Sequence, residues 1–107
     1  MRSYQWEPET NQCWVNVSGH RRRLKQIPTH SGDGFTSGHA AGGGLDLALA
    51  ILLDAIPRPR RNREAPRRYK AFARQIIKEL PASRHWTLSQ TQIEAWLSVQ
   101  RQADQTS

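Results

Sequence analysis

Residues 45–56 read Leu-Asp-Leu-Ala-Leu-Ala-Ile-Leu-Leu-Asp-Ala-Ile, and this stretch decides the fold. As a helix it would be apolar on nearly all sides, a pattern typical of a helix that its neighbours bury. Pro57 marks its end, because the residue before a proline disfavours helical dihedral angles. The sequence therefore predicts a buried helix over residues 45–56, around which the rest of the chain packs.

Short strands are predicted before this helix, within residues 1–27. The run Gln-Cys-Trp-Val-Asn-Val at 12–17 alternates its apolar side chains with a period of two, which is typical of a half-buried strand with Cys13 facing the core. The turn signal Ser18-Gly19-His20 follows it, so residues 23–27 are expected to complete a hairpin. Residues 2–6 add a third strand, about the minimum for a stable sheet.

The segments after the strands are predicted from glycine, proline and the helical period. Residues 28–44 hold six of the seven glycines and form a loop, and residues 57–64 (Pro-Arg-Pro-Arg-Arg-Asn-Arg-Glu) form an extended basic linker. A second helix follows at 66–80, where apolar side chains recur with helical spacing. A third helix spans 89–100, with Ser89 and Gln92 in capping-box spacing at its start.

These predictions combine into one α+β domain of 107 residues, with a small three-stranded antiparallel sheet packed against three helices. No run of about 18 apolar residues occurs that would cross a membrane, and the N-terminus lacks the apolar core of a signal peptide. The single cysteine excludes an intrachain disulfide. We therefore expect a cytoplasmic protein, and its oligomeric state stays open.

The positive charge of the chain is concentrated in one segment. The formal net charge is +7, and residues 58–74 carry eight positive charges against one carboxylate, while the rest of the chain is neutral. Such a segment is typical of a surface that binds phosphate groups or an acidic protein, although a merely solvated linker would look the same. The candidate binding residues are Arg58, Arg60, Arg61, Arg63, Arg67, Arg68, Lys70 and Arg74, with Arg21, Arg22 and Arg23 (beside Lys25) as a second cluster.

No catalytic, metal or cofactor site is predicted. The glycine loop lacks both the P-loop and the dinucleotide-binding spacing, and no zinc-ligand spacing occurs. His30 and His39 could serve as acid and base in a nuclease, which we keep as an alternative. Aromatic side chains could also stack nucleic-acid bases, with Trp6 and Trp14 the best candidates if they share the outer face of the sheet.

Residues 30–54 resemble the central motif of a family of small bacterial, phage and plasmid proteins of unknown function. Phe35, Gly38, Gly43 and the run 46–52 match that motif, in which a glycine-rich segment leads into a Leu-Ala-Leu-Ala-Ile-Leu helix. The similarity extends over roughly residues 4–98, while Ser37, His39, Ala40, Ala41 and Gly44 depart from the usual pattern. The resemblance implies a compact α+β domain and a mobile genetic element in a bacterial host, and it supplies no catalytic residues.

The function expected from these features is that of a non-enzymatic, basic binding protein. The first hypothesis is that the protein inhibits a host defence nucleoprotein complex through its arginine-rich surface, in a role similar to that of an anti-CRISPR protein. The alternatives are an accessory protein that binds DNA or RNA directly without sequence specificity, and the histidine-dependent nuclease. The expected partner is an acidic protein surface or a nucleoprotein complex, with bare nucleic acid as an alternative. We expect neither binding to a membrane nor a cofactor.

Overall fold

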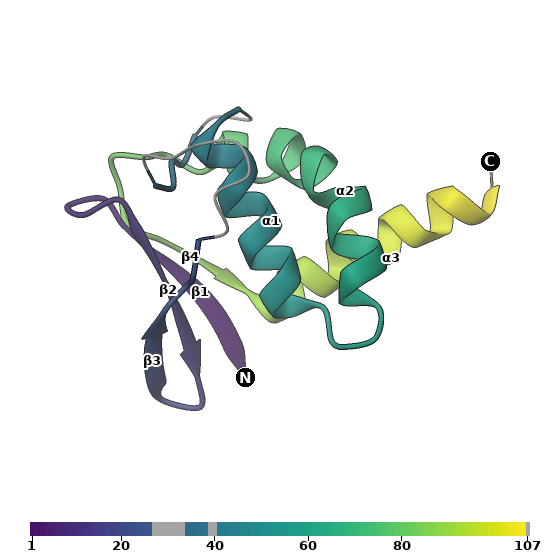
Figure 1. The fold of residues 1–107 in the computed structure, drawn as a ribbon, viewed down its shortest axis with the longest axis horizontal. Coiled ribbons are helices and arrows are strands. Elements are labelled where there is room, and N and C mark those ends of the chain that lie inside the picture. Colours follow the sequence, from purple (N-terminus) through teal and green to yellow (C-terminus); the bar gives the residue numbers. More distant parts are fainter. Residues whose placement is uncertain (27–33, 39–40, 107) are drawn as a thin grey trace.

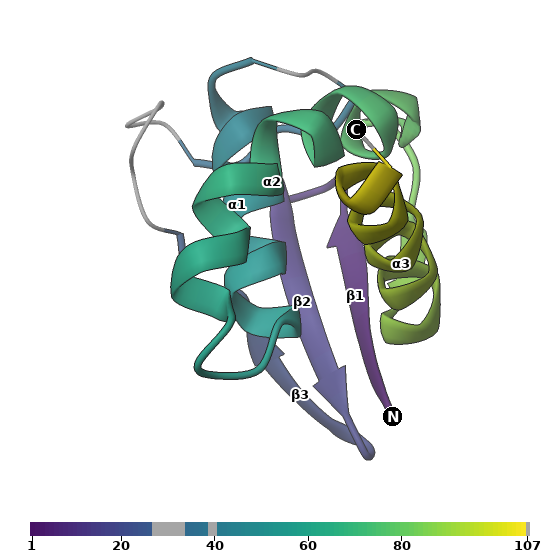
Figure 2. The same ribbon diagram turned by 90° about the vertical axis from the view of Figure 1, so that its right-hand side faces the viewer.

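A four-stranded antiparallel sheet carries three α-helices on one of its faces (Figures 1 and 2). The computed structural model describes residues 1–26, 34–38 and 41–106. Along the chain the elements are β1 (Arg2–Glu7), β2 (Gln12–Val17), β3 (His20–Arg23), α1 (Gly43–Ala55), α2 (Arg61–Gln75), the short 3₁₀ helix η1 (Ile77–Glu79), β4 (Trp86–Ser89) and α3 (Gln90–Thr106). Among the described helices, none has the length and apolarity needed to cross a membrane.

The α+β class is confirmed, but the sheet has four strands where the sequence predicted three. Its order is β3-β2-β1-β4, and β4 pairs antiparallel with β1, with Trp86 opposite Trp6 and Ser89 opposite Ser3. In the sequence, β4 reads as the approach to a helix cap. Its four residues are recognisable as a strand only through their pairing with β1, 80 to 86 residues earlier.

The third strand begins earlier than residues 23–27, where it was predicted. Ser18 and Gly19 have positive φ values of 50° and 85°, so they form a two-residue hairpin turn that reverses the chain at once. His20 therefore pairs directly with Val17, and β3 ends at Arg23. The turn signal was correct, and its tightness set the register of the strand.

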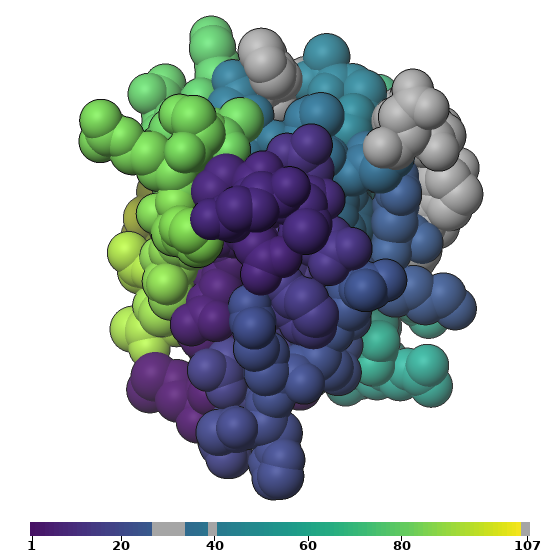
Figure 3. All heavy atoms as spheres, turned by 90° about the vertical axis from the view of Figure 1, so that its left-hand side faces the viewer, coloured from purple at the N-terminus to yellow at the C-terminus, as the bar shows by residue number. Residues whose placement is uncertain are grey.

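One face of the sheet packs against α1 and builds the core. Tyr4, Trp6, Cys13 and Val15 are all almost completely buried, which confirms that Cys13 faces the interior. The helices lie in front of the strands in Figure 2, whereas the opposite view in Figure 3 is dominated by the strands and the segments that connect them. The outer face of the sheet is therefore open to solvent.

The predicted buried helix is confirmed, although it begins two residues early, at Gly43. Most of α1 is buried, and Leu47, Ile51 and Leu52 have no exposed surface. A Cβ atom at Gly43 would lie 2.5 Å from the carbonyl oxygen of Gly34, so a side chain there would block the approach of the loop. The rest of the predicted loop, 28–44, is described only at 34–38 and from residue 41 onward.

Helix α2 takes up half of the predicted linker. It begins at Arg61, so residues 61–64 are helical, and Pro66 lies inside the helix rather than at its first position. The backbone bond that Pro66 cannot donate would reach the carbonyl of Asn62, and both residues are exposed, where water can replace it. The helix also ends before residue 80: the backbone N–H of Ile76 donates the last i→i−4 bond, to the Phe72 carbonyl at 2.8 Å, and a 3₁₀ helix follows.

Helix α3 starts with the predicted capping box and runs further than predicted. The Ser89 hydroxyl accepts a hydrogen bond from the backbone N–H of Gln92 at 3.1 Å. In return, the side-chain oxygen of Gln92 accepts one from the backbone N–H of Ser89 at 2.8 Å. The helix continues to Thr106 rather than to residue 100. Arg101 and Asp104 account for the added turns, since both bind side chains of α2.

Candidate functional site

Four cations form an exposed stripe along α2, which we call the α2 stripe: Arg63, Arg67, Lys70 and Arg74. They recur at i, i+4, i+7 and i+11, which places them on one side of a helix. Arg58 and Arg60, in the turn before the helix, are exposed as well. Six of the eight predicted residues of segment 58–74 thus face solvent together.

Arg68 faces the opposite side of α2 and is only 8% exposed. Its Nε donates to Glu64 at 3.1 Å, and its Nη2 donates to Asp104 of α3 at 2.6 Å. Arg101 also donates two hydrogen bonds to Glu64, at 2.9 and 2.6 Å. The hydrogen bonds from Arg101, and then from Arg68, lower the pKa of Glu64 to about 2, against the opposing effect of burial. The structure therefore uses Arg68 to join α2 to α3.

A second ion-pair network centres on Asp54, near the end of α1. Its carboxylate accepts hydrogen bonds from Arg22 of β3 at 2.5 Å and from Tyr4 at 2.7 Å. Arg2 donates to the backbone carbonyl of Asp54 at 2.6 Å and lies 3.4 Å from its carboxylate. Burial and the neighbouring Asp54 raise the pKa of the Tyr4 hydroxyl far above its ordinary value. Tyr4 is therefore a neutral donor that holds Asp54 in place.

The two predicted basic clusters meet beside Asp54. A hollow of about 150 Å³, which we call the basic hollow, is lined by Arg22 and Lys25 from one segment and by Arg61 from the other, with Asp54 between them. Arg22 and Arg61 are 39 residues apart in the sequence. Arg61 is the first residue of α2, so the basic hollow adjoins the start of that helix.

Arg21 and Arg23 lie on the outer face of the sheet, beside Trp14. Their guanidinium carbons are 4.2 and 5.8 Å from the centroid of the Trp14 ring, within the range of cation–π attraction. Arg21 also lies 3.6 Å from the Glu7 carboxylate. Arg22 lies between these two residues in β3 and points to the inner face of the sheet, because side chains alternate along a strand.

The two tryptophans proposed for base stacking do not share a face. Trp6 is 1% exposed, stacks in parallel on Trp86 with ring centroids 6.0 Å apart, and donates to the Ala82 carbonyl at 3.0 Å. It is therefore a core residue. Trp14 lies on the open face of the sheet, and its indole N–H has no hydrogen-bond partner among the described residues.

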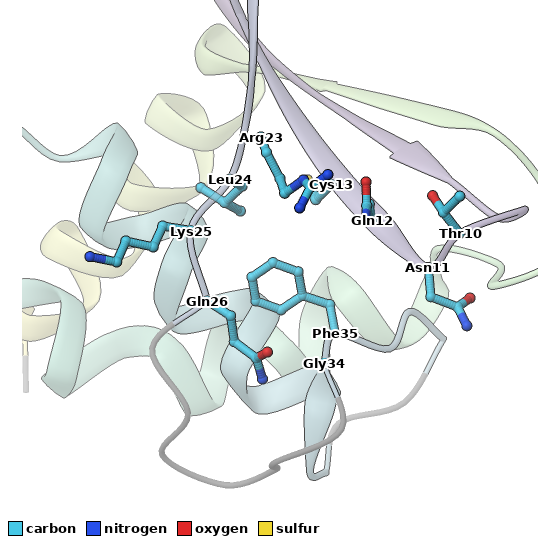
Figure 4. A pocket seen from close by; sticks show the side chains of 10 residues that line it. All are labelled: Thr10, Asn11, Gln12, Cys13, Arg23, Leu24, Lys25, Gln26, Gly34 and Phe35. Atoms are coloured by element: carbon cyan, nitrogen blue, oxygen red, sulfur yellow. The ribbon is translucent and has the colours of Figure 1, made fainter.

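A hollow of about 450 Å³ lies where β2 begins and β3 ends (Figure 4). Figure 4 shows the Phe35 ring in its centre, while Lys25 extends away from that ring. Cys13 lines the hollow, but burial raises the pKa of its thiol to about 12. A raised pKa disfavours the thiolate, which is the reactive form of cysteine.

The residues of the nuclease alternative, His30 and His39, lie outside the described residues. Of the other two histidines, His20 is exposed, and His85 lies 3.2 Å from Glu9 on the surface. In the part of the chain that the structure describes, no three His, Cys, Asp or Glu residues come together as metal ligands.

The sequence reasoning missed two arginines that the structure brings to these networks. Arg2 reaches Asp54 across 52 residues, and Arg101 reaches Glu64 across 37 residues. Neither stands in a basic run, so no sequence signal distinguishes them from ordinary surface arginines. The five carboxylate contacts of Glu64 and Asp54 to arginine exist only once helices and strands pack.

Comparison with known proteins gives a family but no function. Residues 6–99 match a family of unknown function, DUF6166. No curated protein and no solved structure matches the chain. Since the family match covers most of the 107 residues, the chain belongs to the DUF6166 family.

Proposed function

We propose that this protein is a non-enzymatic binding protein that docks its arginine-rich surface on a nucleoprotein complex. The observation that carries the proposal is the meeting of two basic segments at the basic hollow, where Arg22 and Lys25 lie beside Arg61, the first residue of α2. A flexible basic linker would not hold its charges in fixed positions, whereas six of the eight cations of segment 58–74 lie on the helix α2 itself. A fixed array of cations favours a specific docking surface.

Most charges of the α2 stripe are available to a partner, and Arg67 alone of its four cations lies near a carboxylate of the described residues, 3.4 Å from Asp104. Glu64, the carboxylate of segment 58–74, binds Arg68 and Arg101 on the buried side of α2. Among the described residues, Arg63, Lys70 and Arg74 form no ion pair with any carboxylate. An arginine fork binds phosphate and carboxylate groups with two hydrogen bonds, so a phosphate-bearing complex suits the stripe.

The finer form of the proposal concerns the biological setting. The sequence resembles proteins of phages, plasmids and bacteria, and such elements meet nucleic-acid-guided defence complexes in the cytoplasm of a bacterial host. We infer that the partner is a complex of this kind and that docking inhibits it. The guide or target strand of such a complex would supply the phosphates.

The test is target-DNA binding by a purified, guide-loaded defence complex, measured with and without this protein. We expect the wild type to reduce target binding and the pair Arg63→Glu with Lys70→Glu to lose at least about tenfold in potency. The matched control is the pair Lys78→Glu with Arg84→Glu, which reverses the same two charge types outside α2. If the wild type leaves several such complexes unaffected, the inhibitory role is wrong.

A second candidate function is direct binding of DNA or RNA, which the open sheet face favours. Trp14, flanked by Arg21 and Arg23, offers a ring and two guanidinium groups where no helix covers the sheet. Aromatic rings on such faces stack unpaired bases. A mobility shift with bare nucleic acid at physiological salt separates the candidates, because only direct binding predicts a tight complex there.

A further inference from the structure

We propose that the basic hollow is a phosphate site, and that it lies in a groove that takes one strand of nucleic acid. This inference rests on the proposed function and names the chemistry that the surface recognises. The site is built by Arg22 and Lys25 from the sheet and by Arg61 from α2, beside Asp54. Its ligand is a phosphate group of a sugar–phosphate backbone.

Three hollows follow one another along this side of the molecule and share their lining residues. The hollow of about 450 Å³ around Phe35 shares Leu24 and Lys25 with the basic hollow. The basic hollow in turn shares Asp54 and Arg61 with a third hollow of about 390 Å³. We call this series the basic groove. Adjoining hollows with a cation at each junction suit a single strand, whose backbone follows a positively charged groove.

The charge in the basic hollow exceeds what Asp54 can neutralise. Three cations line it against one carboxylate, and that carboxylate already accepts from Arg22 and Tyr4. Among the described residues, Arg61 has no ion pair, and its Nε is shielded from solvent without an acceptor. The described residues therefore leave this nitrogen without an acceptor, which a bound anion would supply.

A phosphate fits this donor arrangement better than a second carboxylate. Guanidinium and ammonium groups approach the hollow from β3, from the segment after it and from α2. A phosphate presents several oxygens in different directions to such donors, whereas a carboxylate presents two in one plane. The volume of about 150 Å³ also suits one small anion rather than a bulky side chain.

The first experiment maps inorganic phosphate on ¹⁵N-labelled wild-type protein by NMR. We expect saturable shifts of the amide signals of Leu24, Lys25 and Arg61, and the loss of these shifts in Arg61→Ala. The variant Arg61→Lys keeps the charge without the fork and should bind more weakly than wild type. Shifts confined to the α2 stripe, or an equal response to glutamate and phosphate, would overturn the phosphate site.

The second experiment measures a labelled single-stranded oligonucleotide by fluorescence anisotropy. We expect Arg61→Ala to lose about tenfold in affinity and to lower the salt dependence by about one counterion, with Arg84→Ala unchanged as the control. A duplex of the same sequence should bind less tightly than the single strand. Circular dichroism of each variant shows whether it is folded, and Arg61→Lys tests the site if Arg61→Ala is not.

The outcomes separate this inference from the proposed function. If Arg61→Ala keeps wild-type affinity while Arg63→Glu with Lys70→Glu loses it, the groove is wrong and the docking surface stands. If phosphate binds at Arg61 but no nucleoprotein complex is affected, the site stands and the inhibitory function is wrong. If an oligoglutamate peptide binds as tightly as the oligonucleotide, and this binding also depends on Arg61, the groove is a site for acidic proteins. That result would overturn the phosphate site.

Discussion

At the scale of single residues, Glu64 shows how one carboxylate joins two helices. It lies in the first turn of α2, is 8% exposed, and binds Arg68 of its own helix and Arg101 of α3. Removing its charge would leave Arg101 without the carboxylate that it binds, and Arg68 with Asp104 alone. Uncompensated charges in a largely buried setting destabilise a fold more than a surface pair stabilises it.

We predict that Glu64→Gln lowers the free energy of unfolding at pH 7 by about 1–2 kcal/mol, since solvent screens part of the network. The lowered pKa of Glu64, about 2 against an ordinary 4.5, also sets a pH dependence. Stability from this group is complete above pH 4.5 and is lost as the pH falls toward 2. Urea unfolding of both proteins across this range checks it, and equal acid sensitivity would contradict the assignment.

Gly43 shows how a missing side chain lets a loop cross a helix. An added Cβ would meet the Gly34 carbonyl oxygen at 2.5 Å and the Thr36 amide nitrogen at 2.8 Å, and both are backbone atoms. We predict that Gly43→Ala costs about 1–3 kcal/mol, although alanine favours helices over glycine. Thermal unfolding measures the effect, and a raised melting temperature would show that the loop yields freely.

At the scale of elements, Ser37 fixes the loop before α1 to two segments that follow α2. Its hydroxyl donates to the Leu80 carbonyl at 2.7 Å and accepts from the Trp86 indole at 3.0 Å, with no exposed surface. The Gly38 amide adds a hydrogen bond to the Ile77 carbonyl at 3.1 Å. These bonds position β4 for its pairing with β1.

We predict that Ser37→Ala lowers the free energy of unfolding by about 1–3 kcal/mol, because it removes the partner of a part-buried carbonyl and of a part-buried indole N–H. Ser98→Ala, an exposed position on α3, is the matched control and should change stability little. Hydrogen exchange of the β4 amides is expected to accelerate in Ser37→Ala. Unchanged exchange there would show that β4 holds its place without the loop.

The elements also show which parts of the fold the sequence could predict. The apolar run of α1, the alternation of β2 and the capping box at Ser89 are local patterns, and each is confirmed. The strand β4 and the start of α2 depend on distant partners. Arg61, where α2 begins, lies beside residues of α1 and β3, and no local pattern in 57–64 records that neighbourhood.

The candidate site follows the same division. The concentration of positive charge in segment 58–74 could be predicted from the sequence. Which of its cations face solvent and which face the protein could not. Arg68 turns inward because Asp104 and Glu64 lie on that side, and Arg61 turns toward Asp54. Both choices depend on carboxylates that come from elsewhere in the packed structure.

At the scale of the whole molecule, the charge makes binding sensitive to salt. Cations that contact phosphates release counterions, so we predict that affinity for the nucleic acid or nucleoprotein partner falls steeply between about 50 and 200 mM salt. The slope of affinity against salt, measured by anisotropy, should be smaller for Arg63→Glu with Lys70→Glu than for wild type. A slope near zero in the wild type would exclude a surface that works through phosphate contacts.

The central claim is that two segments far apart in the sequence form one binding surface. The most direct test compares three charge-reversed pairs for binding to the guide-loaded complex: Arg23→Glu with Lys25→Glu, Arg63→Glu with Lys70→Glu, and the control Lys78→Glu with Arg84→Glu. We predict that the first two pairs each weaken binding by about tenfold or more and that the control pair binds as the wild type does. Equal losses in all three pairs, or a loss in only one of the first two, would contradict a single surface.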